Sequence, residues 1–181
     1  MPSQRTTVLI VSDSHGYLDP RLADLSRRCD IAVHAGDIMS GEVLEALRPR
    51  SGEVIAVRGN NDVAHKWQDN RRAALAGLPE QQLVDLPGGR LAVEHGHRIW
   101  DARNTHARLR RKYRHARAIV YGHTHKRVCD TGADPWVLNP GASGRIRNHG
   151  GPSCLVLTAS RRHWRLQELA FAAGSGAGCT S

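Results

Sequence analysis

Five short runs of apolar, mostly β-branched residues constrain the fold of this chain, because each run stops at a loop rich in Asp, Asn, His and Gly. The five segments read TTVLIVSDSHG, DIAVHAGD, GEVIAVRGNND, GRLAVEHGH and ARAIVYGHTH. Runs of this length and composition are typical of buried β-strands. Layered α/β proteins gather their functional groups at the carboxyl ends of such strands. The pattern therefore predicts an α/β fold in which these polar loops meet.

Helical segments are expected between the strands, at residues 19–29, 41–48 and 101–115. Asp19 and Pro20 form a typical helix start, since an aspartate caps free backbone N–H groups and a proline fits the first turn. Gly88-Gly89 separates two apolar segments, which indicates a β-hairpin. Two further strands are expected at SCLVLTAS and HWRLQELA.

The chain has 181 residues, enough for one domain with a substantial core, which we place at residues 1–173. Residues 174–181 are small and polar, and we expect them to form a disordered tail. No apolar run approaches the ~20 residues that span a bilayer, and no secretory signal precedes the first strand. The cysteines are scattered, with no CxxC pair, as suits a reducing compartment. These features predict a cytoplasmic protein with no membrane partner.

Basic residues outnumber acidic ones by 26 to 17, which gives a formal net charge of +9 at pH 7. Nearly all of them are arginines, whose planar guanidinium group suits phosphate. This charge fits a phosphate-bearing partner, nucleic acid included, but a compositional bias toward arginine explains it equally well. The same two interpretations apply to the basic segment at residues 101–115, which is either a phosphate-attracting rim or a solvated helix face.

Polar motifs stand in a defined order at the ends of the five runs. They are Asp13-x-His15, Gly36-Asp37, Gly59-Asn60-Asn61-Asp62, His95-Gly96-His97 and Gly122-His123-Thr124-His125. This set resembles the calcineurin-like metallophosphoesterase superfamily, and in its short length and following NPG it is similar to the small bacterial and archaeal phosphodiesterase branch. The resemblance extends from Val8 to Arg147. It implies an α/β fold, a two-sheet β-sandwich flanked by helices, with a two-metal site at one end.

The resemblance also implies a ligand set for two divalent metal ions, with Mn expected, or Ni, Zn, Fe or Co. The first ion is held by Asp13, His15 and His125, the second by Asn60, His95 and His123, and both are bridged by Asp37. Carboxylate, imidazole and amide ligands together suit these metals. A hydroxide that bridges the two ions then attacks phosphorus in line. The groups expected to act in catalysis are Asp37, Asn60, Asp62 and His95.

Further polar residues flank this ligand set. Asp62 either orients its neighbours or forms an ordinary Asx turn. Asn61 stands where many superfamily members carry histidine, and an asparagine cannot serve as a general acid near neutral pH. His97 is assigned to the pocket, and with Asn61 and Arg147 it makes the expected contacts to substrate. His34 either supports the adjacent Gly-Asp motif or is a satisfied interior histidine.

These residues predict a metal-dependent phosphodiesterase that acts on small phosphate esters or nucleotides. Two alternatives keep the same site, a nuclease and a phosphomonoesterase. A third is a non-catalytic protein-binding scaffold, because a fold alone does not establish a function. The chain is poor in aromatic residues, so a stacking platform for single-stranded nucleic acid is not expected. The sequence leaves the physiological substrate and homo-oligomerisation open.

Overall fold

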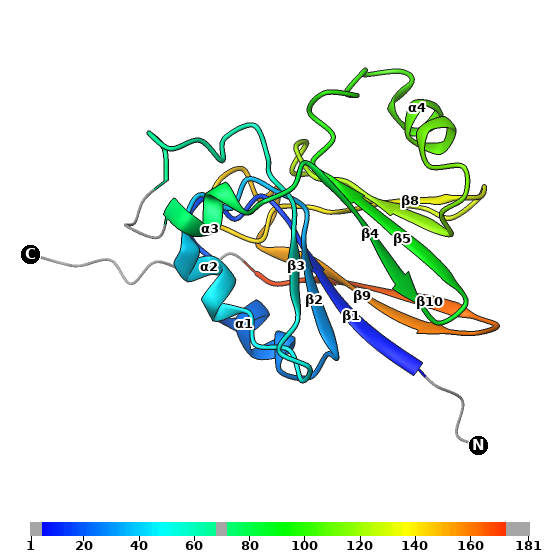
Figure 1. Ribbon diagram of the computed structural model, residues 1–181, viewed down its shortest axis with the longest axis horizontal. Coiled ribbons are helices and arrows are strands. Elements are labelled where there is room, and N and C mark those ends of the chain that lie inside the picture. Colours follow the sequence, from blue (N-terminus) through cyan, green and yellow to red (C-terminus); the bar gives the residue numbers. More distant parts are fainter. Residues whose placement is uncertain (1–4, 68–71, 173–181) are drawn as a thin grey trace, which may run out of the picture.

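The computed structural model describes residues 5–67 and 72–172, which fold into two five-stranded β-sheets with helices on their outer faces (Figure 1). This architecture confirms the predicted α/β fold, a two-sheet β-sandwich flanked by helices. The predicted tail, residues 174–181, lies outside the described residues.

The first sheet has the strand order β10-β9-β1-β2-β3. Its strands are β1 (Arg5–Val11), β2 (Ile31–His34), β3 (Val54–Ala56), β9 (Ser153–Ser160) and β10 (Trp164–Ala170). The first three run parallel, with Val11 opposite His34 and His34 opposite Ala56. β9 pairs antiparallel with both β1 and β10.

The second sheet has the strand order β4-β5-β6-β8-β7. Its strands are β4 (Gln81–Leu86), β5 (Gly89–Glu94), β6 (Ala118–Val120), β7 (Arg127–Asp130) and β8 (Trp136–Pro140). β4 and β5 form the predicted hairpin, and β5, β6 and β8 run parallel. β7 and β8 were not predicted, because β7 has no fully buried residue and β8 ends in Asn139 and Pro140, so neither has the pattern of an apolar run.

The described part of the chain contains the helices α1 (Pro20–Ser26), α2 (Gly41–Ala46), α3 (Arg72–Ala76) and α4 (Thr105–Lys112). The first two predicted helices are present but end earlier than expected, and α3 was not predicted. The prediction for residues 101–115 is wrong at its start, because a carboxylate oxygen of Asp101 accepts a hydrogen bond from the N–H of Arg103 and holds a turn there. Within residues 5–67 and 72–172, no helix is both long and apolar enough to cross a bilayer.

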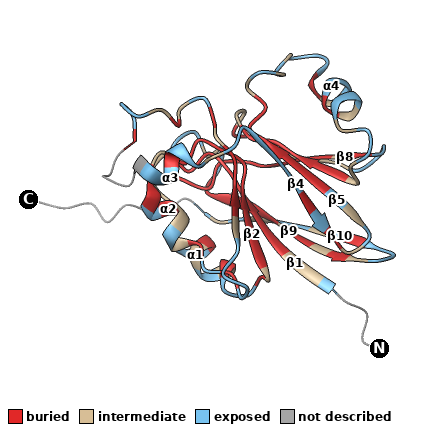
Figure 2. Cartoon of the chain, in the orientation of Figure 1, coloured by how far each residue is buried: buried red, intermediate tan, exposed pale blue. Residues whose placement is uncertain are grey.

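Alternation along the strands separates a core between the two sheets from two outer layers (Figure 2). Val8 and Ile10 of β1 point between the sheets, where Leu138 of β8 also lies, whereas Leu9 points outward. The first three helices cover the outer face of the first sheet, and α4 covers the second sheet through Leu109. Burial of this apolar surface is the main favourable contribution to folding.

The carboxyl ends of the parallel strands in both sheets lie on the same side of the sandwich. The loop after β1 reaches the loop after β6, where the backbone N–H of His123 donates to Oδ2 of Asp13 at 3.0 Å. Within the second sheet, the N–H of Gly122 donates to the His95 carbonyl at 3.1 Å. The polar motifs of the sequence therefore come together at one edge of the molecule, as the strand-end pattern predicts.

The core between the sheets accounts for much of the stability, and two leucines on strands of one sheet test this. We expect Leu138→Ala to lower the free energy of unfolding by about 2–5 kcal/mol, because Leu138 is fully buried and its truncation leaves a cavity. Leu83→Ala removes the same atoms from a side chain that is 55% exposed, and its effect should stay within about 0.5 kcal/mol. Urea denaturation measures both values, and equal effects would contradict this account of the core.

Candidate metal centre

Five of the seven predicted ligands have a backbone conformation that L-residues rarely adopt. They are Asp13, His15, Asp37, His123 and His125, whose φ angles lie between 49° and 68°. Such residues cost about 1–3 kcal/mol each and persist only where the surrounding structure holds them. The loops after β1, β2 and β6 are thus bent in a way that turns these side chains toward one another.

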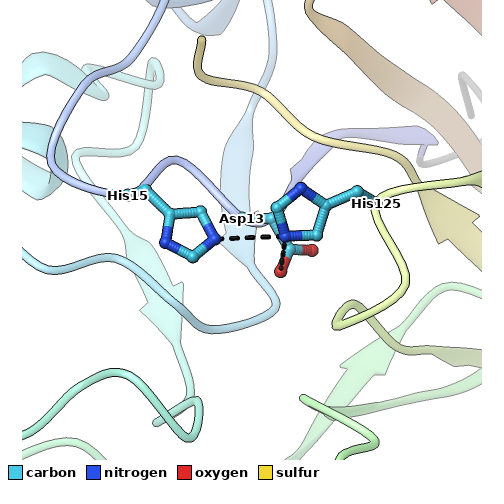
Figure 3. A group of neighbouring side chains, drawn as sticks. All are labelled: Asp13, His15 and His125. Carbon is cyan, nitrogen blue, oxygen red and sulfur yellow. Dashed lines mark hydrogen bonds and ion pairs between the residues drawn. The ribbon is translucent and has the colours of Figure 1, made fainter. Parts of the chain in front are cut away.

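The first group of converging donors is Asp13, His15 and His125, whose ligand atoms all lie within 4.8 Å of one another (Figure 3). Nε2 of His15 is 3.1 Å from Nε2 of His125, and the latter atom is 3.4 Å from Oδ1 of Asp13. The group joins the first sheet to the second, since His125 comes from the loop after β6. These are the three residues predicted to hold the first ion, and the structure brings them together.

The second group of converging donors is Asp13, Asp37 and His95. Oδ2 of Asp37 lies 3.3 Å from Nε2 of His95 and 3.8 Å from Nε2 of His15, so one carboxylate oxygen faces both halves of the site. Oδ1 of Asn60 lies 3.1 Å from Nε2 of His95 and 3.2 Å from Nδ1 of His123. All seven predicted ligands therefore converge, with Asp37 between the two halves, where a bridging ligand is expected.

The hydrogen bonds of His95 show that this arrangement calls for a positive charge. Nδ1 of His95 donates its hydrogen to the Ala35 carbonyl at 2.8 Å. A neutral imidazole has one N–H, so in that state Nε2 would present a lone pair to Oδ2 of Asp37 and Oδ1 of Asn60, which are also acceptors. Either a second proton on Nε2, which then donates to Asp37, or a cation between these atoms removes the conflict. Burial lowers the pKa of His95, but Asp37 and Asp13 outweigh it and raise that pKa above its ordinary value. A divalent metal ion satisfies all three lone pairs, and this donor set fits one.

An arginine supplies positive charge to the other half of the site. His125 donates through Nδ1 to the Ile146 carbonyl at 2.9 Å, which leaves its Nε2 as an acceptor. A guanidinium nitrogen of Arg147 lies 3.2 Å from this Nε2 and donates to it. The lone pair of His125 thus points at a cationic group, which is consistent with a cation-binding position. Arg147, predicted as a substrate contact, is placed beside the converging donors.

The two buried carboxylates of the centre differ in protonation. Burial raises the pKa of Asp13 to about 7, although the N–H of His123 donates to it. Burial also pushes the pKa of Asp37 upward, but hydrogen bonds from His95 and Asn61 outweigh it and hold that pKa below its ordinary value. Two neighbouring carboxylates cannot both ionise readily without nearby positive charge. A bound cation removes this restriction.

Asp62 holds two ligand-bearing loops together. Its Oδ1 accepts the N–H groups of Ile38 at 2.9 Å and Met39 at 2.8 Å, and its Oδ2 accepts the N–H of Gly59 at 2.8 Å. The carboxylate thus ties the loop after β2 to the loop after β3. Because these contacts are all to backbone groups, the structure favours the orienting role predicted for Asp62 over a direct part in proton transfer.

His34 also supports the loops. Burial lowers its pKa to about 3, so the ring is neutral. Nδ1 accepts the N–H of Gly36 at 3.2 Å, and Nε2 therefore donates to Oγ of Ser14 at 2.9 Å. Ser14 in turn donates to the Ile38 carbonyl at 3.2 Å. His34 is thus a satisfied interior histidine that at the same time joins the first two motifs.

Asn61 and His97 line the centre without belonging to the ligand set. Nδ2 of Asn61 donates to Oδ2 of Asp37 at 2.7 Å, and its Oδ1 accepts a hydrogen bond from Nζ of Lys66 at 2.6 Å. The His97 ring lies 5.5 Å from the His95 ring. Lys66 was not predicted, because it lies outside the motifs and reaches the site only through the path of the loop after β3.

Glycines next to the ligands leave no room for a side chain. A Cβ atom at Gly122 would lie 2.9 Å from Oδ2 of Asp13 and 3.0 Å from the Ala35 carbonyl, and closer still to Oγ of Ser12. At Gly59 it would overlap the carboxylate of Asp37. The glycines of the GH and GN motifs therefore allow the backbone to approach the carboxylates closely.

Comparison with known proteins agrees with this geometry. Residues 7–162 match the calcineurin-like phosphoesterase superfamily domain, and the chain belongs to that superfamily. A probable metallophosphoesterase of Methanocaldococcus jannaschii is 27% identical over 139 residues, which cover 74% of this chain and 66% of that relative. A phosphodiesterase of the same organism is 24% identical over 172 residues, 86% of this chain and 95% of the relative. The superfamily and the small archaeal and bacterial branch predicted from the motifs are confirmed.

A solved structure supports the fold. Vacuolar protein sorting 29 from Cryptosporidium parvum superposes with a TM-score of 0.69 and 19% sequence identity, covering 92% of this chain and 99% of that one. At this identity the likeness concerns the fold alone. The metal-ligand roles of individual residues stay predictions.

Gly122→Ala tests the close approach of backbone and carboxylate. The new Cβ must displace Oγ of Ser12, which donates to Asp13, and it also crowds Oδ2 of Asp13 itself, so we expect Mn²⁺ affinity to fall by about 10–100-fold. Calorimetric titration of chelator-treated protein measures the affinity. Gly132→Ala is the matched control, because nothing lies within 4 Å of a Cβ at that position. Unchanged affinity in Gly122→Ala would contradict the dependence of the metal centre on this close approach.

Asp62→Asn tests whether Asp62 holds the loops in place or takes part in the reaction itself. One acceptor oxygen becomes an NH₂ group that faces backbone N–H donors, so the free energy of unfolding should fall by about 1–3 kcal/mol, measured with urea in the presence of EDTA. Asp85→Asn is the control, because Asp85 is exposed and its side chain forms a surface ion pair with Arg90. Wild-type stability combined with lost hydrolysis would instead assign Asp62 to the reaction itself.

Proposed function

We propose that this chain is a phosphodiesterase that hydrolyses small phosphate esters or nucleotides with two divalent metal ions, Mn²⁺ or Ni, Zn, Fe or Co, held at the candidate metal centre. Membership of the phosphoesterase superfamily supports ester hydrolysis. The observation that carries the metal requirement is the position of His95 Nε2, which faces the acceptor oxygens of Asp37 and Asn60 and so calls for a positive charge between them. Cytoplasmic localisation remains a prediction.

The metal ions, when bound, lower the pKa of water toward neutrality and neutralise charge on the phosphoryl oxygens. The chain contributes the geometry. Asp37, held by Asn61 and His95, offers one oxygen to both halves of the site. The carbonyls of Ala35 and Ile146 fix the orientation of two histidine rings, so that the lone pairs of Nε2 converge. Little motion of these side chains is then needed during the reaction.

Phosphate contacts come from the rim of the centre. Arg147 lies at the His125 end of the site, and its guanidinium group matches the geometry of phosphate oxygens. His97 lies at the opposite end, beside His95, and its buried Nδ1 has no hydrogen-bond partner among the described residues. We assign both to the binding of the substrate's phosphoryl group, one on each side.

The residue at position 61, an asparagine, limits rapid hydrolysis to esters with good leaving groups. Its side-chain amide is held between Asp37 and Lys66, and although it donates a hydrogen bond it cannot act as a general acid near neutral pH. The leaving oxygen must therefore depart without a proton from this residue. Esters with good leaving groups, such as p-nitrophenolate, are the substrates that this site should hydrolyse most readily, and a phosphomonoesterase remains the alternative reaction of the same residues.

The nuclease alternative depends on the basic charge, and some of the basic residues of α4 have acidic partners. Arg110 pairs with Asp130 at 2.9 Å, and Lys112 pairs with Glu94, so these cations stabilise the fold. Nucleic acid as a partner and homo-oligomerisation stay predictions. The non-catalytic alternative is a protein-binding scaffold, in which the residues of the metal centre would catalyse no reaction.

His123→Ala tests the phosphodiesterase. With Mn²⁺, the wild type should hydrolyse bis-p-nitrophenyl phosphate faster than p-nitrophenyl phosphate, and EDTA should abolish both activities. Loss of the imidazole should reduce kcat/KM for the diester at least about 100-fold. His163→Ala is the control, because His163 is exposed in the turn between β9 and β10.

Three results would contradict the proposal. Hydrolysis that survives EDTA or His123→Ala excludes the metal centre as its source. Faster hydrolysis of the monoester assigns the chain to the phosphomonoesterases. Absence of activity with every one of the named metals favours the scaffold.

A further inference from the structure

Trp100 is a solvent-exposed tryptophan beside the metal centre. The large hydrophobic side chains that are exposed in the described part of the chain are Leu83, Trp100 and Ile146. Trp100 is 46% exposed, and its ring centroid lies 6.3 Å from that of His123, at an interplanar angle of 67°. The indole thus stands edge-to-face against a predicted metal ligand while much of its surface is open to solvent.

The backbone on both sides of Trp100 is anchored. Ile99 donates its N–H to the Gly96 carbonyl at 3.1 Å and packs against the cluster beneath α4. Asp101 donates its N–H to Oγ of Thr105 at 2.8 Å, where α4 begins. The position of the indole is therefore set by its neighbours. Its exposure is a property of the folded loop rather than of a loose segment.

Trp100 extends a cluster of three histidine rings inside the centre, in which the centroids of His95 and His123 are 5.4 Å apart. The His95 and His97 ring centroids are 5.5 Å apart, and the His97 and His123 centroids are 6.3 Å apart, the same separation as between His123 and Trp100. A phosphoryl group held at the metal centre therefore has an aromatic surface next to it. A cavity of about 220 Å³ that His95 and His97 also line is bounded by the charged residues Glu80, Glu94, Arg98 and Lys112, and it offers a planar apolar group no surface comparable to the indole.

We propose that Trp100 is a specificity-determining residue that stacks on the nucleobase of a nucleotide-type substrate whose phosphate lies at the metal centre. This inference rests on the proposed phosphodiesterase and names its substrate class. Every base has a π-face, and stacking on an aromatic side chain strengthens binding whatever the base. Because Trp100 is the single exposed aromatic side chain of large size in the described residues, the site accommodates one base and fits a small nucleotide better than a polymer.

Adenosine 5′-monophosphate and ribose 5-phosphate are the two test ligands, because they differ at the anomeric carbon, which carries adenine in the first and a hydroxyl group in the second. Both are titrated by calorimetry into the Mn²⁺-loaded protein, and chromatography then checks that they are intact. We expect the nucleotide to bind about tenfold more tightly to the wild type. Trp100→Ala should bring the two dissociation constants together by weakening only the nucleotide, whereas Trp100→Phe should keep most of the difference.

Leu83→Ala is the control for loss of an exposed apolar side chain, and it should leave the tenfold ratio unchanged. Equal binding of the two ligands by the wild type, failure of the wild type to bind either, or a ratio that survives Trp100→Ala would each overturn the stacking role. Hydrolysis of bis-p-nitrophenyl phosphate by the wild type is measured on the same samples. A preference for the nucleotide without hydrolysis would refute the proposed phosphodiesterase but support base stacking by Trp100. Hydrolysis without such a preference would support the phosphodiesterase and refute the stacking role.

Discussion

The burial of two carboxylates, Asp13 and Asp37, at the edge of the sandwich is the constraint on which the rest of the site depends. An ionised carboxylate removed from water costs several kcal/mol unless donors or positive charges surround it. The chain provides the donors through backbone N–H groups of neighbouring loops and through His95. These donors are in place only because parallel strands of both sheets end on the same side. The two-sheet architecture is thus what allows acidic groups to be concentrated there.

The supporting groups around the ligands have one task, to hold strained loops in a single arrangement. Asp62 ties the loop after β2 to the loop after β3 through three backbone N–H groups, and His34 with Ser14 ties the loop after β1 to the loop after β2. Glycines beside the carboxylates let the loops approach within contact distance. Any cation that binds the folded chain and not the unfolded one adds stability by mass action. Metal binding and the persistence of these strained conformations are therefore coupled.

How far the sequence predicts this structure depends on how local each signal is. The switch from a β-branched run to a polar loop is local, so five strand ends and the meeting of their loops were predicted from the pattern, whereas the resemblance to the superfamily supplied the ligand set. β7 and β8 were missed because their residues do not alternate in the usual way, and the roles of Asp62 and His34 stayed open because hydrogen-bond partners lie in other loops. The position of Trp100 depends on how Ile99 packs beneath α4, which no motif indicates, so a low aromatic content gave no expectation of a platform.

The free-energy cost of the strained ligand conformations also bears on the choice between a catalytic metal centre and a non-catalytic binding scaffold. Five predicted ligands with positive φ, at about 1–3 kcal/mol each, would consume much of the net stability of a typical domain if nothing compensated them. A binding scaffold has no need of a histidine nitrogen that faces two acceptor oxygens and requires a proton or a cation between them, as Nε2 of His95 does. Replacement of one such residue would relieve repulsion and strain together. The complete set of seven therefore favours a bound metal pair over a scaffold that uses the fold alone.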